Sequence, residues 1–141
     1  VRPLMLTSQI PEITIPVNLE CARVHILGQV TFPDGFPVSA ARGEALGSCT
    51  LRYASGGVQE IPVRHGIEAA RANLIYDATR IDPVATAAER ALEFEKDLPR
   101  EHYQVLLWTV PARRGELAGL HYRLLPGQPA FALFAVTAER G

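Results

Sequence analysis

The segment 48–64 constrains the fold of this chain more than any other, because it alternates apolar and polar residues on both sides of a Ser-Gly-Gly turn at 55–57. Alternation with a period of two is typical of a strand that is buried on one face, and glycine tolerates the positive φ angles of a tight hairpin turn. The sequence therefore predicts an antiparallel β-hairpin. Its core face would carry Cys49, Leu51, Tyr53, Ile61 and Val63, and its solvent face Ser48, Thr50 and Arg52.

The turn itself makes a finer prediction. We expect Gly56 and Gly57 to occupy it, with at least one of them at positive φ. A valine at position 57 should then strain the backbone, whereas Arg52→Ala on the opposite face should cost little.

Eleven prolines and eleven glycines divide the rest of the chain into short pieces. Strands are predicted over 12–17, 22–31, 102–110, 117–125 and 130–138. A long loop is expected over 32–47, a short helical turn over the alanine-rich 84–89, and a strand over 91–96. Seven or so strands separated by turns predict an all-β fold, an antiparallel β-sandwich that spans 1–141 as a single domain.

Composition narrows the classes of partner. The net charge of −1 offers no basic excess to neutralise phosphates, so nucleic acid is not an expected partner. No apolar run approaches the ~20 residues of a membrane-spanning helix, so no membrane partner is expected either. The sequence begins without Met or a leader, and we expect it to be a piece of a longer protein.

Cys21 and Cys49 lie near predicted strand starts, too far apart for a disulfide between antiparallel neighbours, so free buried thiols are expected.

Several segments together are similar to a known type of domain. Ile-Pro-Val at 15–17 and Ala-Arg-Val-His-Ile-Leu at 22–27 are followed by Thr-Leu-Arg-Tyr-Ala-Ser-Gly-Gly-Val-Gln-Glu-Ile-Pro-Val-Arg-His-Gly at 50–66. This pattern resembles the jelly-roll, galactose-binding-like domains attached to bacterial glycoside hydrolases and related secreted proteins, over about Ile13 to Ala138. Ser55-Gly56 replaces the usual Asp-Gly turn, and the late start leads us to expect that the first strand or strands of the jelly roll are absent.

The resemblance implies a non-catalytic accessory module in an extracellular or periplasmic setting, with carbohydrate binding as its activity. A protein holds a sugar by packing an aromatic ring on the pyranose and by hydrogen-bonding its hydroxyls with polar side chains. Only the stretch around Tyr76 combines an aromatic with several such side chains, on what we expect to be a loop. The predicted ligand-binding residues, all within 64–82, are Arg64, His65, Asn73, Tyr76, Asp77, Arg80 and Asp82. The simpler alternative is that these side chains only close the loop onto the sheets.

Other candidate sites have simpler interpretations. Asp77 and Asp82 flank Arg80 and could bind calcium through their carboxylates, but an ion pair with Arg80 is favoured, and no cofactor is expected. Glu93 and Glu95 would share a solvated strand face rather than act as the carboxylate pair of a glycosidase.

Two functional hypotheses stay open beside each other. The first is carbohydrate binding, and the second is a structural or assembly domain that packs on a neighbouring domain or subunit without binding sugar. An independent enzyme is least favoured, because the sequence has no nucleophile elbow and its four histidines lack metal-ligand spacing. We expect no catalytic or metal-binding residue, and we expect Trp108 and Tyr53 to be part of the core.

Overall fold

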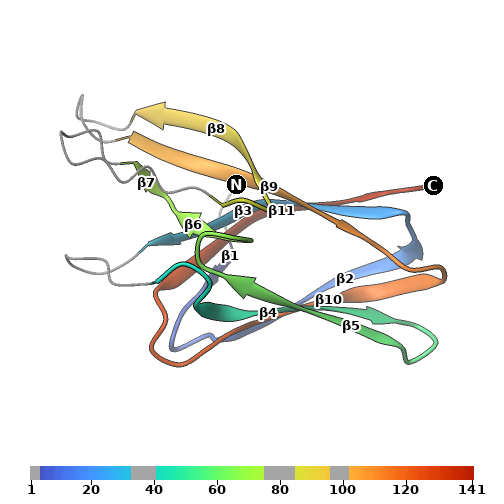
Figure 1. The fold of residues 1–141 in the computed structure, drawn as a ribbon. Helices are drawn as coiled ribbons and strands as arrows, with labels where there is room; N and C mark the ends of the chain where they lie inside the picture. Colours follow the sequence, from blue (N-terminus) through green and yellow to red (C-terminus); the bar gives the residue numbers. More distant parts are fainter. Residues whose placement is uncertain (1–3, 33–40, 75–84, 96–101) are drawn as a thin grey trace.

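The computed structural model describes residues 4–32, 41–74, 85–95 and 102–141, which form β-strands and turns without a helix (Figure 1). In chain order the described strands are β1 (Leu4–Leu6), β2 (Glu12–Glu20), β3 (Arg23–Phe32), β4 (Ala45–Tyr53), β5 (Val58–Arg64), β6 (Ala70–Arg71), β7 (Asn73–Leu74), β8 (Glu89–Glu95), β9 (His102–Pro111), β10 (Glu116–Leu124) and β11 (Ala130–Glu139).

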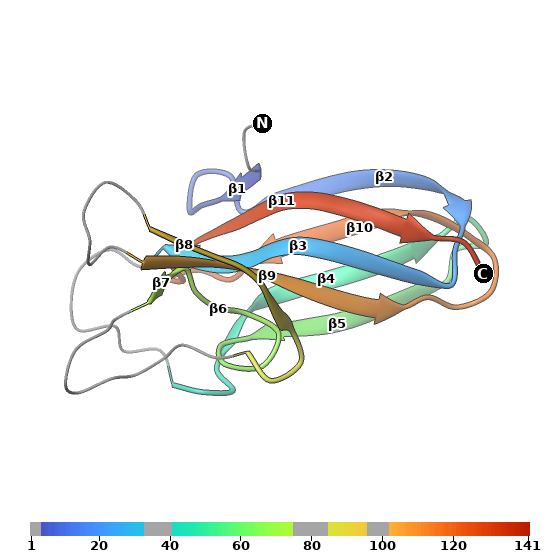
Figure 2. The same ribbon diagram turned by 90° about the horizontal axis from the view of Figure 1, so that it is seen from above.

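The strands form two sheets packed face to face, which Figure 2 shows from above. One sheet contains β1-β11-β3-β9 with β6, β7 and β8 attached, and the other has the order β2-β10-β4-β5. Along β1 to β5 and β9 to β11, the chain crosses to the opposite sheet at every step except the β4–β5 hairpin, and β8 adds a strand beside β9 in the same sheet. That order is a double-sheet jelly roll, so the predicted fold class is confirmed. The first strand of the jelly roll, which we expected to be absent, is present as β1 and pairs with β11 at the edge of its sheet.

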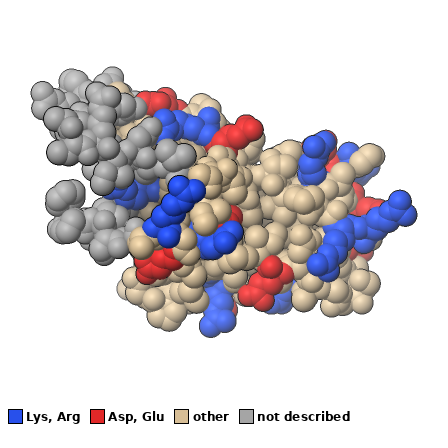
Figure 3. All heavy atoms as spheres, in the orientation of Figure 1, with Lys and Arg blue, Asp and Glu red and all other residues tan. Residues whose placement is uncertain are grey.

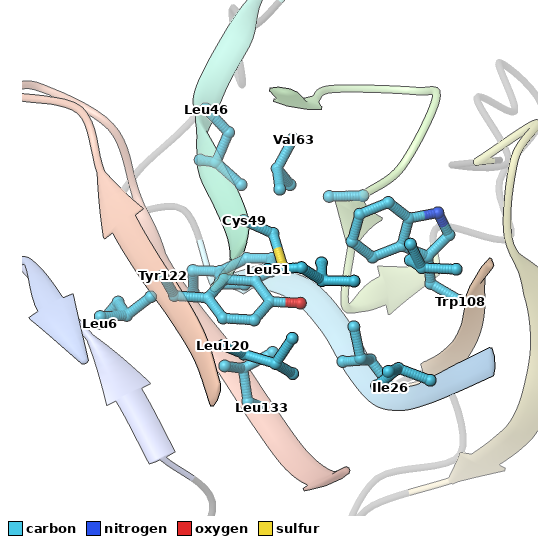
Figure 4. Close-up of a cluster of buried hydrophobic side chains, with 14 of the residues drawn as sticks. Leu6, Ile26, Leu46, Cys49, Leu51, Val63, Trp108, Leu120, Tyr122 and Leu133 are labelled. Atoms are coloured by element: carbon cyan, nitrogen blue, oxygen red, sulfur yellow. The ribbon is translucent and has the colours of Figure 1, made fainter. Parts of the chain in front are cut away.

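The core between the sheets contains the face that the hairpin pattern predicts. Cys49, Leu51 and Tyr53 are buried, and Arg52 is exposed on the opposite side. Figure 4 shows Cys49 and Leu51 packed with Trp108 and Tyr122 in this cluster. Both cysteines are free and buried, as expected.

The turn of the hairpin differs from the expectation in one respect. Gly56 has a φ of 95°, whereas Gly57 has no positive φ, and an added Cβ at Gly57 would meet only the Ser55 hydroxyl at 3.8 Å. The strain that we expected from Gly57→Val therefore belongs to position 56.

A β-bulge in β3 changes the course of that strand. Gly28 and Gln29 have φ angles of 131° and 52°. Val30 pairs with Ala132 and Gly28 with Leu133, so Gln29 is the extra residue. Its side chain is fully buried, accepts a hydrogen bond from the Tyr122 hydroxyl at 2.9 Å and donates one to the Glu68 carbonyl at 3.0 Å.

The bulge makes room for the short strands β6 and β7. Before it, β3 pairs with β9 as far as Gly28 and Leu106, and after it β3 pairs instead with β6. The chain then passes to β7, which pairs with the first residues of β9. Residues 70–74 thus lie between two strands that are neighbours elsewhere in the sheet.

Two local predictions need correction. Residues 85–88 form a turn, with an Ala88 to Ala85 hydrogen bond of 3.3 Å, and β8 already begins at Glu89, so the described part of 84–89 is not helical. Pairing with β9 overrides the helix propensity of alanine there. The loop predicted over 32–47 is shorter, because β3 includes Phe32 and β4 begins at Ala45. The predicted strands at 91–96, 102–110, 117–125 and 130–138 correspond to β8, β9, β10 and β11.

We predict that the protein loses stability at alkaline pH through Cys49. Burial raises the pKa of this thiol from 9.0 to about 12, and burial also raises the pKa of its hydrogen-bond partner Tyr122. The folded state therefore holds the Cys49 proton more tightly than the unfolded state, so the stabilisation is complete below pH 9 and is lost as the pH rises toward 12. Between pH 8 and 10.5 urea unfolding should show a loss of about 2 kcal/mol that Cys49→Ser largely removes. An equal loss in the variant would contradict this account.

Candidate functional site

Three neighbouring strands bring an amide and two aromatic rings into one row. Asn73 of β7 is the register partner of Tyr103 of β9, and Tyr103 is in turn the register partner of Phe94 of β8. Directly opposed residues of a sheet point to the same face. The rings of Phe94 and Tyr103 stack with centroids 5.8 Å apart, Phe94 is 45% exposed, and Asn73 is exposed as well. We call this row the 73–103–94 platform.

A second polar feature is the turn that follows β5, at residues 64–69. The carbonyl oxygen of Arg64 accepts hydrogen bonds from the backbone N–H groups of Ile67, Glu68 and Ala69, each at 3.2 Å. Backbone hydrogen bonds also tie this turn to the segments 41–44 and 85–88. The turn is therefore held on two sides by other parts of the chain.

The side chain of His65 links the 64–69 turn to another part of the chain. It is 6% exposed, and its Nε2 lies 2.9 Å from the amide oxygen of Gln128, in the connection between β10 and β11. With that oxygen as acceptor, the imidazole carries its proton on Nε2. His65 lies where the sequence placed it, at the end of the hairpin, and its contact with a ligand stays a prediction.

Arg64 is oriented by a buried carboxylate. Its Nε donates to both carboxylate oxygens of Glu68, at 2.7 and 3.3 Å, and Glu68 is only 3% exposed. This hydrogen bond raises the pKa of Arg64. The Arg64 side chain is 41% exposed, and its two terminal nitrogens make no hydrogen bond within the described residues. They form a fixed fork of N–H donors that faces outward.

The predicted site residues are only partly covered by the structure. Arg64 and His65 belong to the 64–69 turn, and Asn73 belongs to the platform. Tyr76, Asp77, Arg80 and Asp82 lie outside the described residues, and with them the calcium hypothesis. Trp108 and Tyr53 are 4% and 7% exposed, which confirms them as core residues.

Sequence reasoning missed Tyr103, Phe94 and Glu68 as possible site residues. Their roles depend on which strands become neighbours, and alternation within one strand does not specify that. Glu68 offered one local signal, its spacing of four residues from Arg64, which is typical of ion pairs in helices and here occurs in a turn.

Two other kinds of feature, a metal-ligand cluster and a membrane-spanning helix, are absent from the described residues. No three His, Cys, Asp or Glu side chains in those ranges are grouped as metal ligands would be. Nor does the described part of the chain contain a helix long and apolar enough to cross a membrane.

Comparison with known proteins identifies no relative. No protein-family model matches the chain, and no curated protein or solved structure matches it significantly. The similarity to galactose-binding-like domains therefore stays an expectation from the sequence.

We predict that removing Arg64 destabilises the protein more than removing its partner Glu68. Arg64→Met leaves a nearly buried carboxylate without its cation, whereas Glu68→Met leaves an exposed guanidinium that water solvates. In thermal melts at neutral pH, Arg64→Met should lower the Tm by several degrees and by more than Glu68→Met. The reverse order would show that Glu68 is not held by Arg64.

Proposed function

We propose that this chain is a non-catalytic carbohydrate-binding module and that the 73–103–94 platform is its sugar-binding surface. The observation that carries the proposal is the exposed Phe94 ring, stacked on Tyr103 and placed in register with the exposed amide of Asn73. A sugar presents an apolar C–H face and a rim of hydroxyls, and an aromatic surface next to an amide matches both.

The setting of the platform favours recognition of a ligand without rearrangement. Its three residues lie on hydrogen-bonded strands, and Asn73 is held between β3 and β9 by the residues of β6 and β7. Side chains on strands are positioned more accurately than those on free loops, so little conformational entropy is lost on binding.

The sequence-predicted residues extend the proposed site. Tyr76 and Asp77 follow Asn73 closely in the chain and would add a ring and a carboxylate. Arg64 would add the outward fork of its terminal nitrogens, which suits vicinal hydroxyls or a carboxylate of a sugar. An extracellular or periplasmic location, as an accessory domain of a larger bacterial protein, is part of this proposal.

A second candidate function is assembly on a neighbouring domain or subunit. Leu92, two residues before Phe94 on the same strand face, is 56% exposed, so the apolar surface of β8 is larger than one ring. The edge strands β2 and β5 of the other sheet contain Pro16 and Pro62, which discourage strand addition there, and β8 contains no proline. Such a surface also fits a protein partner.

We predict that the chain binds a polysaccharide and that Phe94→Ala weakens binding about tenfold, because the stacked ring is lost. The matched control is Leu92→Ala, which removes an exposed aliphatic side chain from the same face and should change affinity little. A glycan array with plant, algal and bacterial polysaccharides identifies the ligand, and isothermal titration with the whole chain gives the affinities.

The two candidate functions predict different results for these variants. Absence of binding to every polysaccharide, or binding that Phe94→Ala leaves unchanged, contradicts the carbohydrate proposal. If light scattering shows an oligomer that Leu92→Ala and Phe94→Ala both dissociate, the surface is an assembly interface instead.

A further inference from the structure

A groove lies at the end of the sandwich opposite the 64–69 turn, where β2 turns into β3 and β9 turns into β10. Its volume is about 700 Å³, which is within the range of ligand-binding clefts. Its walls combine Leu19 and Ala112 with three arginines, Arg113, Arg114 and Arg140.

The arginines of the groove are largely unpaired within the part of the chain that the structure describes. Arg113 is anchored, because its backbone N–H donates to the Tyr53 hydroxyl at 2.8 Å and its Nη1 donates to the Val58 carbonyl at 3.3 Å. Arg114 and Arg140 make no ion pair or hydrogen bond there. Figure 3 shows basic side chains gathered at this end of the molecule, although the net charge of the chain is −1.

The carboxylates nearby do not cancel this charge. Glu20 is the one acidic side chain among the described residues that line the groove, and it accepts a hydrogen bond from the backbone N–H of Gly115 at 3.4 Å. Glu139 is already engaged by other side chains, since it accepts hydrogen bonds from Arg23 at 2.6 Å and from His25 at 2.7 Å. Among the described side chains that line the groove, three are cationic and one is anionic.

The apolar residues of the groove indicate which class of acidic ligand fits best. Leu19 and Ala112 offer aliphatic surface, and Val58, which is 56% exposed, lies beside Arg113 through the hydrogen bond to its carbonyl. None of the described residues that line the groove is aromatic, so they offer no ring on which a sugar could stack. A peptide that alternates acidic and aliphatic side chains matches both the charges and the apolar surface.

We propose that this groove binds an acidic segment of a partner protein, with its carboxylates on Arg114 and Arg140 and an aliphatic side chain against Leu19 and Ala112. The site uses none of the residues of the 73–103–94 platform. It is therefore independent of the proposed carbohydrate binding, and either can fail without the other.

The test is fluorescence anisotropy with the whole chain and a labelled peptide of alternating glutamate and leucine, and the same peptide with glutamine in place of glutamate. The acidic peptide should bind, and its affinity should fall as salt rises from 50 to 500 mM. Arg114→Glu should weaken binding about tenfold, because an attraction becomes a repulsion. Arg123→Glu, which makes the same charge change on an exposed residue at the end of β10 that lies away from the groove, should have little effect.

Three results would overturn the proposal. The first is equal weakening by Arg114→Glu and Arg123→Glu, which would mean that only net charge matters. The second is equal binding of the glutamine peptide, or no binding of either peptide. The third is that the chain binds a sulfated polysaccharide but not the acidic peptide, and that Arg114→Glu abolishes the polysaccharide binding. Circular dichroism of each variant verifies that it is folded.

Discussion

The arrangement of the molecule at its loop end depends on one buried amide. Gln29, the extra residue of the bulge in β3, joins the Tyr122 hydroxyl of the opposite sheet to the backbone of the 64–69 turn. A buried amide that lost these partners would cost free energy, so the two hydrogen bonds specify the register of β3 as well as the position of the turn. The bulge bends β3 away from β9, and residues 70–74 occupy the resulting space. Asn73 reaches the row of Tyr103 and Phe94 only because of this insertion.

The two ends of the sandwich are built for different chemistry. At the loop end, a nearly buried carboxylate orients Arg64, and hydrogen-bonded strands place aromatic rings beside an amide. At the other end, an open groove is lined by Arg113 and by Arg114 and Arg140, which make no ion pair within the described residues. A module that binds a polysaccharide at one end and a partner protein at the other would attach its partner to that polysaccharide. The side chains whose substitution tests the two proposed activities, Phe94 and Arg114, are exposed, so changing them need not unfold the domain.

The sequence predicts much of the fold because the burial of a strand face produces a pattern of apolar residues within the strand itself. The alternation of Cys49, Leu51 and Tyr53 specifies a buried face, and the apolar run around Trp108 specifies a central strand. The bulge has no such local pattern, because Gly28-Gln29 lies inside an apolar strand and depends on hydrogen bonds from Gln29 to Tyr122 and Glu68. The platform was not predictable for a related reason. Its register joins residues that are up to thirty positions apart, and alternation within one strand carries no information about that pairing.

The most direct test of this account is amide hydrogen exchange of Gln29→Asn. Asparagine tolerates the left-handed backbone but is one methylene shorter, so it cannot reach both Tyr122 and Glu68. We expect exchange to become at least about tenfold faster for the amides of residues 66–74, while the β4–β5 hairpin keeps its protection. If residues 66–74 exchange as slowly as in the unaltered protein, the Gln29 amide is not what holds the loop end in place.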